Sequence, residues 1–419
     1  MSKAVEFFAN RYPLLWALVT TQLRTTLWVA ALLSGTMLLA IQAYVYLSAD
    51  GVYTFYGLVI GGDFVVFDTV ADAAARGEAA AMYNPDVLQP ALRERFPGAE
   101  SEFLLFWAYP PTMLFVLMPA ALFPYLASYA VWSISTFSLY AASLVALWRD
   151  KLAIVVALTA AVTFQALITG QNGFLTAALI ATAAFFAKDR PVLAGLAAGL
   201  LTVKPQLGLL IPIAFVAAGC WRAFFTAAVT GIVLAAASFA VFGLEAWTAF
   251  FESFRNQNEI ITSDLYPFRK MVTAYGVLSY FNAPVVVAQI VQMSVTLSLM
   301  AFVAIIWRKV DDRAIRAAAL IAAIPLATPY ALFYELTIFV PAILLITKTS
   351  IDRGWLDWEK VSIGTLWMMC FFVPGDSKEL GVPFAFIVAC LAFFIVARRA
   401  LPEAGFRFSS ANLQPSPGS

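Results

Sequence analysis

The chain has 419 residues, of which 62% are hydrophobic and only 12% are charged, and its formal net charge at pH 7 is +1. Soluble globular proteins carry about 25% charged residues, so this composition excludes an ordinary soluble domain. The nearly neutral charge gives no indication of nucleic-acid binding, and the absence of histidine excludes every catalytic or metal site that depends on an imidazole.

Apolar runs of about 15 to 24 residues recur along almost the whole sequence. Such runs predict transmembrane helices, whereas a β-barrel would show alternating segments of about 10 residues. We therefore expect one all-α polytopic membrane domain over residues 1–401, with about twelve spans (eleven to thirteen). Residues 402–419 are rich in Ser, Pro and Gly, which predicts a disordered cytoplasmic tail.

The first elements are a surface segment, a span and a long loop. A weakly amphipathic stretch over residues 4–22 is expected to lie along the membrane, and the first span to cover residues 27–47. No cleavage site follows, so we expect this span to be permanent. The loop over residues 49–106 has more acidic than basic side chains, which favours the external side, and we expect it to carry short amphipathic helices.

Residues 107–148 contain two apolar segments, separated at Phe123-Pro124-Tyr125. Several of the later apolar segments are short for a hydrocarbon core about 30 Å thick, and short helices that meet at polar breaks indicate an internal cavity. These later segments fall at 152–168, 173–187, 191–203, 205–219, 222–243, 284–307, 314–328, 331–347, 360–373 and 381–397.

Short basic junctions favour the cytoplasm, and here they predict an inner-membrane protein with both termini cytoplasmic. The polar breaks at 170–172, 204–206, 328–330 and 374–376 then lie outside, together with the loops 49–106 and 244–283. In this arrangement the segment 109–123 is re-entrant. The alternative makes 109–123 a full span and 191–219 one broken helix. The junctions are Arg149/Lys151, Lys188/Arg190, Arg222, Arg308/Lys309/Arg313/Arg316, Lys348/Arg353 and Arg398/Arg399.

The sequence Gly61-Gly62-Asp63 opens an apolar stretch within the first loop. A carboxylate at the mouth of a membrane is costly to desolvate, which favours a functional role for Asp63. The alternative is a helix N-cap, although Val66 stands where a capping box would have Glu or Gln.

The residues that follow Asp63 indicate a helix on the membrane surface. Phe64 and Phe67 form an apolar pair that can lie on the bilayer. Asp68, Asp72 and Arg76 are spaced by four residues, which is typical of one solvated helical face.

Two polar breaks carry candidate ligands. At Lys204-Pro205-Gln206 the proline ends the helix, and a lysine there can bind a phosphate as a point charge or simply snorkel from a helix end. The amides of Gln171 and Asn172 can bind sugar hydroxyls or phosphate. The alternative for that break is a tight turn at Asn172-Gly173.

Two further charged sites follow. Glu335, next to Tyr334, enters an otherwise apolar helix and needs a partner, for which we expect Lys204; a structural ion pair or interfacial anchor is the alternative. The loop 244–283 mixes aromatic and charged residues, which indicates an interfacial helix, and its Arg269-Lys270 pair could instead hold an anionic lipid headgroup. No nucleotide-binding or metal-ligand motif is present, so neither cofactor nor metal is expected, and Cys220, Cys370 and Cys390 are interpreted as core residues.

Taken together, these motifs resemble those of the membrane glycosyltransferase family GT87, also called DUF2029. The resemblance implies a GT-C fold, a polyprenyl-phosphate sugar donor such as polyprenol-phosphate mannose, and a catalytic Asp on the first external loop, which is Asp63 here. The matching residues are Gly62-Asp63-Phe64, Tyr109-Pro110-Pro111, Thr169-Gly170-Gln171-Asn172-Gly173-Phe174-Leu175, Arg190-Pro191-Val192-Leu193-Ala194-Gly195 leading to Lys204-Pro205-Gln206, and Thr328-Pro329-Tyr330.

One motif departs from the family. Where the family often has Pro-Tyr-Leu-His-Asp-Tyr-Asp, this chain has Pro329-Tyr330-Ala331-Leu332-Phe333-Tyr334-Glu335. The histidine is therefore Leu332 and the last aspartate is Glu335, so any role of that histidine in handling the donor is lost or rerouted.

The resulting hypothesis is an inverting transferase that moves a mannose-like hexose from the lipid donor to a lipid or glycan acceptor. Asp63 would be the general base, and Lys204, with Arg269 or Lys270, would offset charge on the departing phosphate. Two alternatives remain: a flippase or transporter of lipid-linked sugars, and a catalytically silent subunit of envelope-polysaccharide assembly. The other substrate-binding candidates are Tyr109, Gln171, Asn172, Gln206, Tyr334 and Glu335.

Overall fold

The computed structural model describes residues 6–7, 10–13, 23–98, 106–261, 268–373 and 382–406. Within these ranges every named element is an α-helix or a short 3-10 helix, and the β contacts are isolated bridges. The all-α prediction is therefore confirmed. Most of the expected surface segment 4–22, the junction 374–376 and the tail from residue 407 onward lie outside the described residues.

Six helices of the described chain are long and apolar enough to cross a membrane. Two shorter helices, α8 (Lys151–Leu158) and α9 (Ala161–Thr169), meet at a bend of 49° and would add a seventh span if they cross together. These elements confirm a polytopic membrane protein. The six helices are α3 (Leu23–Leu47), α7 (Tyr125–Leu147), α13 (Trp221–Ile261), α15 (Val285–Lys309), α17 (Phe339–Arg353) with the preceding turn η6 (Phe333–Ile338), and α19 (Phe384–Glu403). The helix α13 is kinked at Gly243, whose backbone is not helical.

The remaining apolar segments form shorter helices, and twelve spans would require several of them to cross as well. The chain breaks where the polar residues predicted it: α9 ends at Thr169, and Lys204 stands between two 3-10 turns. The shorter elements are α10 (Gly173–Phe186), α11 (Pro191–Leu200), η3 (Leu201–Val203), η4 (Pro205–Gly208), α12 (Ile211–Ala217), α16 (Arg313–Ala327) and α18 (Glu359–Met369).

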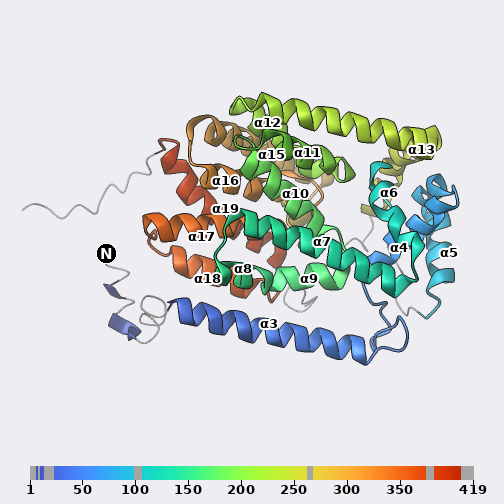
Figure 1. The fold of residues 1–419 in the computed structure, drawn as a ribbon, viewed down its shortest axis with the longest axis horizontal. Helices are drawn as coiled ribbons and strands as arrows, with labels where there is room; N and C mark the ends of the chain where they lie inside the picture. The colour runs from blue at the N-terminus through green and yellow to red at the C-terminus, as the bar shows by residue number, and fades with distance from the viewer. Residues whose placement is uncertain are drawn as a thin grey trace, which may run out of the picture.

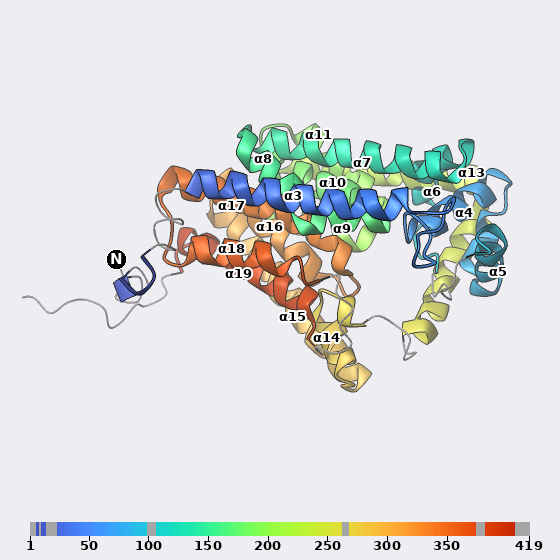
Figure 2. The ribbon, with the colours of Figure 1, turned by 90° about the horizontal axis from the view of Figure 1, so that it is seen from below.

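The helices between α3 and α7 gather at one end of the bundle, and α3 begins at the opposite end (Figures 1 and 2). The helices α3 and α13 run along opposite edges (Figure 1). The segment between α3 and α7 contains α4 (Phe64–Ala75), η1 (Ala79–Tyr83), α5 (Pro85–Arg95), α6 (Thr112–Leu117) and η2 (Met118–Leu122), and a second polar segment contains η5 (Phe268–Lys270) and α14 (Ala274–Tyr280).

The first loop forms a second hydrophobic core together with residues of α7, η3 and α13, which overturns two expectations. Phe64 and Phe67 are fully buried among aromatic side chains and do not lie on the bilayer. Asp68 has no exposed surface, because α5 folds over α4 and the Nε of Arg95 donates a hydrogen bond of 2.8 Å to its carboxylate. The solvated face predicted for Asp68 is therefore wrong, whereas Asp72 and Arg76 pair at the surface as expected.

Small residues bring the helices of the main core close together. An ideal Cβ on Gly195 or Gly199 of α11 would lie 2.4 Å from the Cβ of Thr226 or Thr230 of α13. Glycines spaced by four residues let two helix backbones approach in this way. Since η3 continues from α11, this packing also fixes where the break at Lys204 lies.

Candidate functional site

Asp63 lies at the start of α4, but its side chain does not cap the helix. The first amides of α4 are instead met by main-chain oxygens: the N–H of Phe64 donates to Gly61 O over 2.9 Å. The half-buried carboxylate accepts a hydrogen bond of 2.9 Å from Nε2 of Gln171, which is 108 residues away in the sequence. The N-cap interpretation is therefore wrong, and the carboxylate is directed toward the break between α9 and α10.

Glycines allow the Asp63 turn to approach this break. Gly61 and Gly170 both adopt positive φ, at 90° and 59°, where side chains are disfavoured. An ideal Cβ on Gly170 would lie 2.5 Å from the carbonyl oxygen of Gly61 and 2.6 Å from Cβ of Phe64. The contact between the two turns thus requires glycine at position 170.

One face of α7 holds both turns in place. The hydroxyl of Tyr125 donates to Ile60 O over 2.6 Å, and the indole Nε1 of Trp132 donates to Gly170 O over 2.9 Å. Between them, the hydroxyl of Tyr129 donates to Leu167 O over 2.6 Å. The spacing of these aromatic residues places them on one helix face, but it does not show which groups that face binds.

Lys204 forms the second half of the site, and it is only 5% exposed. Its ammonium group pairs with the carboxylate of Glu335, which is 1% exposed, and donates a hydrogen bond of 3.1 Å to Oδ1 of Asn172. The ring centroids of Tyr109 and Tyr334 lie 5.5 and 5.1 Å from the same nitrogen. The expected pairing of Lys204 with Glu335 is confirmed.

The adjacent residues Gln171 and Asn172 join the two halves. Gln171 binds Asp63 through Nε2 and accepts a hydrogen bond of 3.1 Å at Oε1 from the Tyr109 hydroxyl. Asn172 binds Lys204 and does not cap α10 with its side chain. The functional interpretation of this break is thus supported by contacts that a simple turn does not need.

Arg269 and Lys270 belong to η5, and the residues that follow η5 bind the main chain of the motif Pro329–Glu335. The N–H of Val272 donates to Ala331 O over 2.9 Å, and the hydroxyl of Thr273 donates to Pro329 O over 3.2 Å. The ammonium group of Lys270 lies 5.9 Å from the ring centroid of Phe333. The positive charge of Lys270 acts on the carboxylate of Asp63, so Arg269 and Lys270 lie beside the site.

The electrostatics of Asp63 are those of a basic carboxylate. Burial raises its pKa above the ordinary value, while the hydrogen bond from Gln171 and the charges of Lys270 and then Lys204 oppose the rise. Burial conversely lowers the pKa of Lys270, against the attraction of Asp63. Lys270 therefore acts on Asp63 more strongly than Lys204 does.

Two other candidate positions are placed differently. The side chain of Gln206 is exposed, and it is the main-chain oxygen of this residue that accepts a hydrogen bond, of 3.0 Å, from Thr328. Leu332 packs in a small apolar cluster with Met271 and Tyr275. The position where the family often has histidine thus makes an apolar contact here.

Two buried polar atoms of the cluster have no hydrogen-bond partner among the described residues: Nδ2 of Asn172 and Oε2 of Glu335. One is a donor and the other an acceptor, which is the combination that hydroxyl groups of a sugar can satisfy. The described residues contain no group of three acidic or cysteine side chains that could hold a metal ion.

The family model for glycosyltransferase family 87 matches residues 107–329, which is more than half of the chain. This range includes Tyr109, Gln171, Asn172 and Lys204, whereas Asp63 and Glu335 lie outside it. No curated protein and no solved structure matches the chain. On the strength of the family match, the chain belongs to glycosyltransferase family 87 and is a membrane glycosyltransferase.

Proposed function

We propose that the chain transfers a mannose-like hexose from a polyprenyl-phosphate donor to a hydroxyl of a lipid or glycan acceptor, with inversion at the anomeric carbon. The donor class comes from the family resemblance. The observation that carries the assignment of roles is the hydrogen bond from Gln171 to Asp63, which orients a half-buried carboxylate that also interacts with the charges of Lys270 and Lys204.

Asp63 is the general base in this proposal. A raised pKa makes its carboxylate a better proton acceptor than an ordinary aspartate, and Gln171 fixes its orientation. Asp63 takes the proton of the acceptor hydroxyl, the acceptor oxygen forms a bond to the anomeric carbon, and the bond from that carbon to the lipid-phosphate oxygen breaks. The phosphate leaves with the electron pair.

The cation that faces the leaving phosphate is then Lys270, with Arg269 beside it. Lys204 is less suited to this role than the sequence indicated, because its charge is already offset by Glu335. Lys270 is the cation with the larger effect on Asp63. A cation at the leaving group stabilises the transition state, in which negative charge grows on the phosphate.

The Lys204 cluster positions the donor sugar. Asn172 Nδ2 can donate to a sugar hydroxyl, and Glu335 Oε2 can accept from one. Tyr109 and Tyr334, which flank Lys204, supply flat ring faces beside these atoms. In this proposal, Lys204 holds Asn172 and Glu335, the two residues that bind the sugar, in position.

We further propose a GT-C fold with about twelve spans, in an inner membrane, with both termini cytoplasmic and the Asp63 loop on the external face. The bent pair α8–α9 and the short apolar helices α10, α11, α12, α16 and α18 would cross together with the six longer ones. Labelling of single cysteines at positions 171, 204 and 330 from the external side would support this orientation. Labelling only from the cytoplasmic side would overturn it.

The test of function replaces Asp63 with Asn and measures transfer from a panel of polyprenyl-phosphate hexoses, with the product identified by mass spectrometry. Asp63→Asn keeps the shape of the side chain but removes its basicity, so transfer should fall by at least about 10²-fold. The control is Asp86→Asn, an exposed aspartate of the same loop, which should retain full activity. Full turnover by Asp63→Asn would refute its role as the base.

A further inference from the structure

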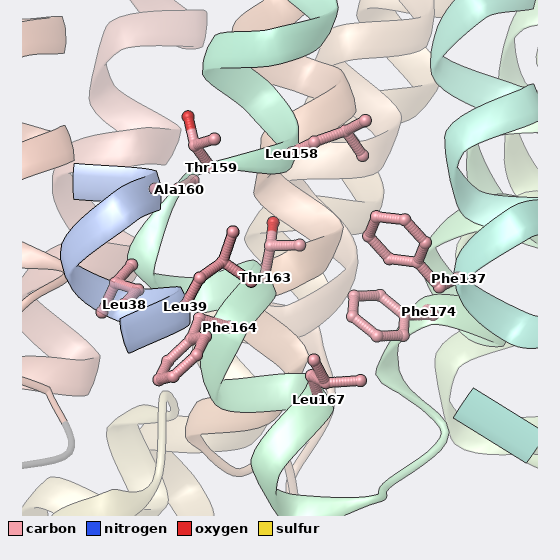
Figure 3. A pocket seen from close by; sticks show the side chains of 11 residues that line it. Leu38, Leu39, Phe137, Leu158, Thr159, Ala160, Thr163, Phe164, Leu167 and Phe174 are labelled. Atoms are coloured by element: carbon pink, nitrogen blue, oxygen red, sulfur yellow. The ribbon is translucent and has the colours of Figure 1, made fainter. Parts of the chain in front are cut away.

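An apolar groove lies between α3 and the bent pair α8–α9 (Figure 3). Its volume is about 250 Å³. The groove is separate from the cluster of Asp63 and Lys204, since none of the residues that bind those two side chains lines it. Its walls include Leu38 and Leu39 of α3, Phe137 of α7, Phe164 and Leu167 of α9, and Phe174 of α10.

The bend between α8 and α9 accounts for the groove. The two helices meet at 49° around Thr159 and Ala160, and α3 packs against both of them. There an ideal Cβ on Gly35 would lie 2.8 Å from Cγ2 of Thr159, so the contact is close. A continuous helix such as α3 cannot pack closely along both helices of a bent pair, so space is left between α3 and the bend.

The lining is suited to a hydrocarbon chain and not to a headgroup. The hydroxyl of Thr159 donates to Val155 O over 2.7 Å, and that of Thr163 donates to Ala157 O over 3.0 Å. The Thr159 bond stays within the last turn of α8 and the Thr163 bond joins α9 to α8 across the bend, so both threonine hydroxyls of the lining already donate to main-chain oxygens. Leu39 is 65% exposed and Phe174 only 1%, so the groove runs from the outer surface of the bundle toward its core.

The groove and the candidate site lie along the same helix, α9, and the turn that follows it. Leu167 lines the groove, and its carbonyl is bound by Tyr129, next to the turn that carries Gln171. Phe174 lines the groove two residues after Asn172. From Thr163 to the end of α9 at Thr169 the helix rises only about 9 Å. One ligand can therefore occupy both the groove and the site.

We propose that this groove holds the isoprenoid chain of the donor, with the units nearest the phosphate beside Leu167 and Phe174. The proposal rests on the proposed function, since it takes the donor to be a polyprenyl phosphate. The polar end of the donor lies among Asp63, Gln171 and Lys270, and the chain leaves along α9 into the bilayer past Leu39. The groove thus selects donors by chain length as well as by their apolar character.

The test measures binding of two lipid phosphates to the purified full-length chain in detergent: a polyprenyl phosphate of two isoprene units and one of ten. The long lipid should bind at least tenfold more tightly, because two buried methylene groups already correspond to about tenfold in Kd. In Leu39→Trp, which puts an indole at the mouth of the groove, this preference should fall at least fivefold while binding of the short lipid is unchanged. A second variant, Ala160→Leu, narrows the groove from its floor and should act in the same direction.

The matched control is Leu33→Trp, the same substitution on α3 at a residue that is 68% exposed and does not line the groove. It should keep the preference for the long lipid. Loss of the preference in Leu33→Trp, or its retention in both groove variants, would overturn the proposal while leaving the proposed function intact. Equal binding of phosphatidic acid and the long polyprenyl phosphate would assign the groove to ordinary membrane lipid. If the wild-type chain binds neither polyprenyl phosphate, the proposed donor class itself is wrong.

Discussion

Replacing Glu335 with Gln would leave the ammonium group of Lys204 without its charged partner in a buried place. The two side chains are 5% and 1% exposed, so water cannot take over the interaction. Removing one partner of a buried ion pair costs about 3–5 kcal/mol, because the remaining charge stays desolvated. The amide of Asn172 and the rings of Tyr109 and Tyr334 remain in contact with Lys204 and offset part of that cost. We therefore expect Glu335→Gln to lower the free energy of unfolding by about 3 kcal/mol.

A double-mutant cycle separates the pair from its surroundings. Lys204→Met alone should also destabilise the protein, because it leaves the Glu335 carboxylate unpaired. The double variant Lys204→Met/Glu335→Gln contains no buried charge at this site and should recover about 2 kcal/mol or more relative to the sum of the single effects. Under the proposed function, sugar transfer should stay low in the double variant, because that proposal assigns the positioning of the donor sugar to the Lys204 cluster.

Equilibrium unfolding in mixed micelles, followed by tryptophan fluorescence, measures these energies. The control is Lys188→Met, which removes a surface pair with Asp311 at 3.8 Å and should cost less than about 1 kcal/mol. Stability of Glu335→Gln within about 0.5 kcal/mol of the wild-type chain, or additive single effects in the cycle, would contradict the reasoning from burial.

Three further changes test the turn and packing arguments. Because burial raises the pKa of Asp63, this group contributes stability at low pH that is lost as the pH rises from the ordinary carboxyl pKa through the raised one. Asp63→Asn should lack that loss in unfolding curves measured across this pH range. A gain in the stability of the wild-type chain relative to the variant as the pH rises would contradict the predicted direction. Gly170→Ala should lower the stability and reduce the rate of transfer at least tenfold, because the new Cβ would lie 2.5 Å from Gly61 O at a φ of 59°. Unchanged kinetics would show that the two turns need not touch. Gly195→Ala should cost about 1–3 kcal/mol by overpacking α11 against α13, whereas Gly364→Ala in α18, which meets nothing within 4 Å, should be neutral or stabilising in the same unfolding assay.

The positions of the candidate site residues could be predicted because polar residues are rare in this apolar sequence, and each polar break between apolar segments therefore marks a candidate site. A charged side chain in apolar surroundings requires an oppositely charged partner, and Lys204 pairs with Glu335. The burial of Asp68 could not be predicted in the same way, because its partner Arg95 is 27 residues away on another helix of the loop. A spacing of four residues describes one helix, but it does not show whether a second helix covers that face.

The aromatic residues of α7 show a different limit. Tyr125, Tyr129 and Trp132 follow an ordinary helical spacing, and in a membrane protein such a stripe usually faces lipid or a neighbouring helix. Their role depends on which main-chain oxygens lie opposite, namely those of Ile60, Leu167 and Gly170. These oxygens carry no sequence signal at all, since every residue has one.

The charge balance of the site changes how the departure from the family motif is interpreted. Considered alone, the loss of histidine at Leu332 and the presence of Glu335 cast doubt on donor handling. In the structure Glu335 neutralises Lys204, and Leu332 packs with Met271, directly after Lys270. The buried pair contributes no net charge, so in the proposed mechanism the positive potential that attracts the anionic donor comes from Arg269 and Lys270, beside the residue that Leu332 contacts. The apolar side chain at position 332 would then serve the phosphate indirectly, by fixing Arg269 and Lys270 beside Asp63.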